Sequence, residues 1–166
     1  MSDSLDFTLR EAGPLDLALI QSLANKSWRA HYPGIISEEQ IEYMLDWMYS
    51  VKQLEEDQRR GVEFLLIETS RPMGFAGWEV KEDIAYLHKL YLIPEAMGRG
   101  LGSALLAEVT SRAKERGVSF LQLGVNKYNA KAIKAYERNG FERFDSVCND
   151  IGQGFVMDDY LYRKRL

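Results

Sequence analysis

The chain has very few of the residues that build disulfides or membrane segments. Its 166 residues include one cysteine, Cys148, so an internal disulfide is excluded, as is usual in a reducing compartment. No run of eighteen apolar residues is present, which argues against a membrane-spanning helix. The first residues, Met-Ser-Asp-Ser-Leu-Asp, have neither the positive segment nor the apolar core of a signal peptide. We therefore expect a cytoplasmic protein without a membrane partner.

An excess of positive charge is also missing. The formal net charge is −4 at pH 7, which argues against a nucleic-acid partner. No internal repeat, low-complexity tract or Pro/Gly-rich linker marks a second domain. With 166 residues, 46% of them hydrophobic, the chain is long enough to bury one core. We expect a single domain over residues 1–166.

The first part of the chain has the periodicity of helices. A weak alternation predicts a short strand from Leu5 to Leu9, and leucines at helical spacing predict a helix from Leu15 to Trp28. Ser37 followed three residues later by Gln40 is a capping-box pattern, in which each side chain satisfies a backbone N–H at the start of a helix. We therefore expect a second helix, with an apolar stripe, to begin at Ser37.

From Gly61 onward the pattern changes to that of strands. Three strands joined by short polar links come first, and links so short require antiparallel hairpins. The predicted elements are strands at Glu63 to Ile67, Met73 to Val80 and Ile84 to Leu92, a helix at Gly100 to Arg116, a strand at Phe120 to Val125, a helix at Asn129 to Asn139, and strands near Arg143 to Val147 and Phe155 to Tyr162. This order predicts an α/β fold (α+β by layer), with a single mixed, mostly antiparallel sheet of about seven strands and helices on both faces.

Three glycines fall within five residues between a predicted strand and a predicted helix, in Gly98-Arg99-Gly100-Leu101-Gly102. They let the backbone adopt left-handed conformations and leave the first N–H groups of the helix free for a pyrophosphate. A Walker A loop would need a Gly-Lys-Ser/Thr sequence, which is missing here. A Rossmann fingerprint would need a third glycine where Ser103 stands and an acidic residue where the next strand ends in Asn126. A glycine turn that only permits close helix–sheet packing remains an alternative.

Two longer segments resemble the signatures of the GNAT superfamily of N-acetyltransferases. The segment from Leu90 to Leu106, LYLIPEAMGRGLGSALL, resembles its acetyl-CoA signature. Asn129-Ala130-Lys131-Ala132, followed by Tyr136 and Gly140-Phe141, resembles its second signature. The likeness extends from about Phe64 to the C-terminus and more weakly over the helical N-terminal part. Within the superfamily the chain most resembles the bacterial spermidine/spermine N-acetyltransferases of the PaiA type.

The resemblance implies that an acetyl group passes from acetyl-CoA to a primary amine by direct attack in a ternary complex, without a metal. A β-strand would pair with the pantetheine arm, and the amides of the glycine turn would hold the pyrophosphate. One departure is Met97, which stands where the family usually has Gln or Arg; its N–H could still serve a phosphate, and Arg99 could partly replace the lost side-chain contact. The implied cofactor-binding residues are Leu90, Tyr91, Leu92, Met97, Gly98, Arg99, Gly100, Leu101, Gly102, Ser103, Asn129 and Tyr136.

Amine transfer also needs a base and an acid. An alkylammonium has a pKa of about 10.4, so only about one molecule in 2,500 is nucleophilic at pH 7. His88 is the predicted base, on a face shared by alternation with Tyr86, Leu90 and Leu92, although a hydrogen-bonded strand histidine is the alternative. Tyr136 matches the tyrosine acid of the family, which protonates the CoA thiolate; the alternative is a core aromatic residue.

Acidic and aromatic residues crowd the second predicted helix and its neighbourhood. An acidic, aromatic-lined mouth would attract a polyamine, whereas a solvated helix face is the alternative. The residues concerned are the seven acids Glu38, Glu39, Glu42, Asp46, Glu55, Glu56 and Asp57, with Trp28, Tyr32, Tyr43, Trp47 and Tyr49 nearby. Trp28, Tyr32 and His31, the last expected in a loop, are the predicted acceptor-site residues.

Other acceptors and another class of function stay open. A protein N-terminus, a lysine side chain or an amino-sugar drug could each supply the amine. A domain that binds acyl-CoA as a non-catalytic sensor would keep the glycine turn without needing an acid or a base. A homodimer could form if Phe155 to Tyr162 paired across two copies.

Overall fold

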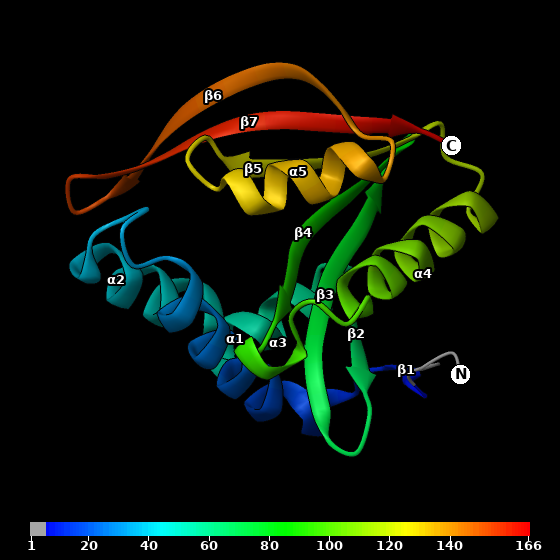
Figure 1. The fold of residues 1–166 in the computed structure, drawn as a ribbon, viewed down its shortest axis with the longest axis horizontal. Helices are drawn as coiled ribbons and strands as arrows, with labels where there is room; N and C mark the ends of the chain where they lie inside the picture. Colours follow the sequence, from blue (N-terminus) through cyan, green and yellow to red (C-terminus); the bar gives the residue numbers. More distant parts are fainter. Residues whose placement is uncertain (1–5) are drawn as a thin grey trace.

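The computed structural model describes residues 6–166, and Figure 1 labels their elements. The helices are α1 (Leu17–His31), α2 (Glu38–Tyr49), α3 (Val51–Arg59), α4 (Leu101–Glu115) and α5 (Ala130–Arg138), with 3₁₀ turns at Pro14–Asp16 and Pro94–Ala96. The strands are β1 (Thr8–Glu11), β2 (Glu63–Glu68), β3 (Pro72–Lys81), β4 (Ile84–Leu92), β5 (Phe120–Asn126), β6 (Glu142–Gly152) and β7 (Phe155–Arg165). The strand predicted at 5–9 corresponds to β1, and Leu5 lies outside the described residues.

Helix α3 is not among the predicted elements. Most of its residues are polar, and only Leu54 and Asp57 are buried, so its apolar stripe is too narrow to stand out in the sequence. Helix α2 does begin as expected, because Ser37 Oγ accepts the N–H of Gln40 at 3.1 Å. The second contact of the capping box, from the Gln40 side chain back to the N–H of Ser37, does not form, and this part of the prediction is wrong. The Gln40 amide instead donates to the carbonyl of Val156 at 2.8 Å, which joins α2 to β7.

Within the described residues the strands form one sheet, in the order β1-β2-β3-β4-β5-β7-β6. Neighbouring strands are antiparallel except β4 and β5, which are parallel. Helix α1 covers one face, where Trp28 packs against Tyr91 with 5.5 Å between ring centroids. Helix α4 covers the other face, where Gly102 lies against Leu92. The predicted mixed, mostly antiparallel sheet with helices on both faces is confirmed.

Strands β4 and β5 are paired over only part of their length. Residues Ile84 to Leu87 pair with Phe120 to Leu123, and beyond them β4 stays with β3 while β5 stays with β7. Figure 1 shows β5 and β7 turning away from β3 and β4, so that the sheet opens into a V beside α5. The β5-facing main chain of β4 beyond Leu87 is therefore open to a ligand.

A β-bulge interrupts β4 at His88. The register of β3 with β4 shifts here, which leaves His88 without a partner. Because a bulge adds one residue to one strand, it reverses the alternation beyond it. The prediction that His88 shares its face with Leu90 and Leu92 is therefore wrong. Instead His88 and Lys89, although adjacent in sequence, both lie on the face that α1 covers.

Strand β7 lies inside the sheet. It pairs with β6 from Phe155 to Arg163 but with β5 only from Asp159 to Arg165, so both edges of its backbone are used from Asp159 onward. Pairing of Phe155 to Tyr162 across two copies therefore cannot use the residues from Asp159 onward, and the homodimer itself stays a prediction. The outermost strand on this side is β6, whose residues are mostly exposed. Among residues 6–166, none of the helices has both the length and the apolar character needed to cross a bilayer.

Candidate active site

The glycine turn has the geometry that an anion needs. Gly98 and Gly100 have φ values of +73° and +77°, in the left-handed region that favours glycine. A Cβ at either position would meet nothing within 4 Å, so the backbone faces open space. Gly100 is the N-cap of α4, and no side chain caps this helix. The first N–H groups of α4 therefore point to a surface where a phosphate can reach them.

Met97 contributes less to this turn than its position predicts. Its backbone N–H donates to the carbonyl of Pro94 at 3.2 Å and closes a 3₁₀ turn. Its side chain is half-buried and packs against the core. The Met97 amide is thus already engaged, whereas Arg99 is exposed beside the turn.

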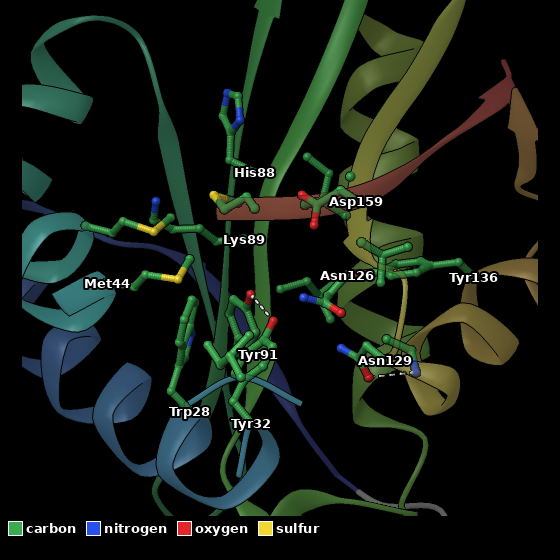
Figure 2. Close-up of a pocket in the computed structure, with 18 of the residues that line it drawn as sticks. Trp28, Tyr32, Met44, His88, Lys89, Tyr91, Asn126, Asn129, Tyr136 and Asp159 are labelled. Atoms are coloured by element: carbon green, nitrogen blue, oxygen red, sulfur yellow. Dashed lines mark hydrogen bonds between the residues drawn. The ribbon is translucent and has the colours of Figure 1, made fainter. Parts of the chain in front are cut away.

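A cavity occupies the V between β4 and β5, and Figure 2 shows its lining. It joins the two faces of the sheet, because residues of α1 and of α5 both line it. The lining includes the predicted residues Trp28, Tyr32, His88, Leu90, Tyr91, Asn129 and Tyr136, together with Gly124, Val125 and Asn126 of β5. Apart from the glycine turn, the fold therefore brings together most of the residues that the sequence selected for cofactor, acid, base and acceptor roles.

Apart from the residues of the glycine turn, 97–103, two predicted residues do not line this cavity. Leu92 is buried and faces the opposite way, under Gly102 of α4. His31 is the last residue of α1 rather than part of a loop, so that expectation is wrong. Burial and the nearby positive charge of Lys131 lower the pKa of His31.

Tyr136 is a packed aromatic residue that also faces the cavity. Its ring packs edge-on against Phe141, with 5.7 Å between centroids, and it also lines the cavity. Burial raises the pKa of Tyr136 above the ordinary value of tyrosine, so the hydroxyl stays protonated at neutral pH. Asn129 is the N-cap of α5 and accepts the N–H of Ala132 at 3.4 Å.

A second cavity of about 560 Å³ adjoins the first on the α1 face. The two share wall residues near the bulge, among them His88, Lys89 and Asp159. The remaining wall carries paired charges, since Asp57 contacts Arg60 at 3.1 Å. A molecule in this second cavity would meet the end of a ligand that fills the V.

His88 is held by a carboxylate on this wall. Its Nε2 lies 3.2 Å from Oε1 of Glu79, and its ring stacks on Tyr86 at an interplanar angle of 8°. Burial acts to raise the pKa of Glu79, but hydrogen bonds from Lys81 and His88 lower it overall. His88 is therefore hydrogen-bonded, as the alternative interpretation expected, and it also lines the cavity, as a base would have to.

Sequence reasoning missed two ionisable residues of the site. Lys89 is only 8% exposed, with Nζ 5.0 Å from the centroid of the Tyr49 ring, and burial lowers its pKa. Burial and the neighbouring Asp158 charge raise the pKa of Asp159 to about 6. Simple alternation would place Lys89 on the opposite face from His88, and only the pairing of β7 with β5 brings Asp159 to the V.

The predicted acidic mouth does not form as expected. Of the seven acids between Ser37 and Asp57, only Asp57 lines either cavity. Glu42 pairs with Arg29, and Glu56 pairs with Arg59, both at the surface. For most of these acids the solvated helix face is therefore the correct interpretation.

The chain is similar to known N-acetyltransferases. Residues 20–141 match the acetyltransferase (GNAT) family. The spermidine N(1)-acetyltransferase of Thermoplasma acidophilum is 28% identical over 93% of this chain and 97% of its own length. The crystal structure of PaiA N-acetyltransferase from the same organism, in complex with coenzyme A, superposes with a TM-score of 0.85 over 97% of this chain and 99% of its own, at 28% identity. The [ribosomal protein bS18]-alanine N-acetyltransferase of Escherichia coli is 34% identical over 66% of this chain and 73% of its own.

The family match covers well over half of the chain, and the fold and the glycine turn agree with it. The chain belongs to the acetyltransferase (GNAT) family and is an acetyl-CoA-dependent N-acetyltransferase.

Proposed function

We propose that this protein transfers the acetyl group of acetyl-CoA directly to a primary amine of a polyamine, with both substrates bound at once. The observation that carries the proposal is the V between β4 and β5. It connects the side of the sheet that holds α4 and α5 with the cavity on the α1 face. A thioester in the V can therefore meet an amine that enters from the other side.

The cofactor would be held largely by main-chain groups. The pantetheine arm would lie along Leu90 and Tyr91 as an added strand, because β5 leaves this part of β4 unpaired. The pyrophosphate would bind the free amides from Gly98 to Ser103 at the start of α4. The relative with a comparable fold and bound coenzyme A supports the choice of cofactor.

The reaction would proceed through one tetrahedral intermediate. The amine nitrogen forms a bond to the thioester carbonyl carbon, and the C–S bond then breaks. An ammonium loses two protons in becoming an amide, of which one reaches the CoA sulfur and the other leaves to solvent. Tyr136 would hydrogen-bond and protonate the leaving sulfur, because burial keeps its hydroxyl in the acid form. A carboxylate or imidazole on the amine side would take the other proton, and His88, which the sequence predicts as the base, lies there beside Glu79.

The relative that spans almost the whole chain supports a polyamine acceptor, since it is a spermidine N(1)-acetyltransferase. Within the site, the carboxylates of Asp57, Glu79 and Asp159 line the acceptor cavity and can attract an alkylammonium. Arg60, Lys81 and Lys89 also line it, and they would limit the number of cationic groups that fit.

A panel of amines tests the proposal. CoA release should be measured as free thiol with spermidine, a monoamine, and a peptide that begins with alanine, at low and physiological salt. We expect spermidine to give the highest kcat/KM and to lose part of this advantage as salt increases. A preference for the peptide would assign a protein N-terminus instead, and acetyl-CoA binding without any amine-dependent release would assign a sensor.

A further inference from the structure

Asp159 stands where the two cavities meet. It lies on β7 opposite Asn126 of β5, and it lines both the V and the acceptor cavity. The missing side chain of Gly124 opens the space in front of it, since a Cβ there would lie 3.4 Å from Asp159 Oδ2. Figure 2 shows the carboxylate directed into the space between β4 and β5.

The other carboxylates of the acceptor cavity already have protein partners. Asp57 accepts hydrogen bonds from Gln53 and Arg60, at 3.0 and 3.1 Å. Glu79 contacts Lys81 and His88. Within residues 6–166, Asp159 has neither a side-chain hydrogen bond nor an ion pair. A half-buried carboxylate without a donor is costly, and an ammonium ligand would satisfy it.

We propose that Asp159 binds the ammonium group of the acceptor and takes its first proton. This inference rests on the proposed function. The proton moves from the amine nitrogen to an Asp159 oxygen and from there to solvent. The neutral amine then attacks the thioester, and its second proton ends on the sulfur.

The charges around Asp159 suit this task. From its own strand, Asp158 raises its pKa, and Lys127, which contacts Asp158 at 2.7 Å, lowers it. Across the cavities it faces His88 and Lys89 of β4. The hydroxyls of Tyr32, Tyr91 and Tyr136 and the ion pairs of Asp57 and Glu79 complete the titratable lining. Burial is the largest cause that raises the pKa of Asp159 to about 6, which suits a base that works near neutrality.

His88 is less well placed for the first proton. Its Nε2 is held by Glu79, and Figure 2 shows its ring pointing away from Tyr136 and Asn129. Asp159, in contrast, is directed into the V itself. His88 with Glu79 would then assist proton release on the outer wall of the cavity.

The test compares D159N, D158N and H88A with the wild type. Asn keeps the shape of Asp159 but can neither bind a proton at neutral pH nor hold a negative charge. Asp158 is the matched control, because strand alternation places its side chain on the other face of the sheet. We would measure kcat/KM for spermidine from pH 5 to 9, and the binding of acetyl-CoA and of spermidine to the CoA complex by calorimetry.

For D159N we expect kcat/KM to fall by roughly 10²- to 10³-fold, with the limb near pH 6 gone, spermidine binding weakened and acetyl-CoA affinity within about twofold of wild type. D158N should stay active with its limb moved to lower pH, and H88A should keep the limb. A D159N profile that keeps both the limb and most of the activity would overturn the proposal. If the wild type turned over no amine, the proposed function would fail, and the spermidine affinity of D159N would still decide whether Asp159 binds the ammonium.

Discussion

Replacing Asp159 with Asn should stabilise the protein above pH 6 and leave its stability unchanged near pH 4. Burial and the Asp158 charge raise the pKa of Asp159 from 3.8 to about 6 in the folded protein. Between these values the folded protein keeps a proton that the unfolded chain has lost, so the contribution of Asp159 to the free energy of unfolding falls as pH rises. Above pH 6 the carboxylate is ionised in the folded protein too, and its buried charge lowers the free energy of unfolding by the full amount. Asn carries no charge and removes this destabilisation.

The size of the gain follows from the shift. A difference of about two pKa units corresponds to at most about 3 kcal/mol. Because the side chain is partly exposed, solvent screens part of this cost, and we expect about 1–2 kcal/mol. For a chain of 166 residues that raises Tm by roughly 2–8 °C.

The assay is thermal unfolding of wild type and D159N without cofactor at pH 4 and pH 8. Asp6→Asn removes the same charge from an exposed position outside the elements of the fold and is the matched control. D159N should unfold at a higher temperature than wild type at pH 8 and at the same temperature at pH 4. An equal difference at both pH values, or a lower Tm at pH 8, would refute the reasoning.

Three further predictions concern other parts of the chain. Tyr136→Phe should lower kcat by roughly 10²-fold or more and change the KM for acetyl-CoA by less than about threefold, in steady-state kinetics; an unchanged kcat would remove Tyr136 from the acid role. Gly100→Ala and Gly117→Ala introduce the same left-handed strain, at φ +77° and +75°, so each should cost about 1–2 kcal/mol in urea unfolding, but only Gly100→Ala should weaken acetyl-CoA binding in calorimetry. Gln40→Ala removes the hydrogen bond to the Val156 carbonyl and should lower the free energy of unfolding by about 1 kcal/mol in the same assay. An unchanged stability would count against this contact between α2 and β7.

Much of the fold follows from the sequence because its periodicity changes sharply at Gly61. Short links after that point required antiparallel strands, and the two motif segments located the glycine turn, Asn129 and Tyr136. These features are local, since each depends on residues close together in the chain. The predicted helix start at Ser37 was correct for the same reason.

The features that the sequence did not reveal depend on contacts between distant segments. The bulge at His88 changes the face of every later residue of β4, and nothing in the alternation of that strand announces it. Asp159 reaches the site only because β7 pairs with β5. For the acids of α2 and α3 the sequence predicted a site where there is none. Their crowding suggested an acidic mouth, but most of them lie on a solvated surface.

The central claim is that acetyl-CoA and an amine occupy the V together and react directly. Initial rates of CoA release, measured over a matrix of acetyl-CoA and spermidine concentrations, test it most directly. The account predicts rates that depend on both substrates, with double-reciprocal lines that converge, as a ternary complex requires. Parallel lines, or release that does not depend on the amine, would contradict it.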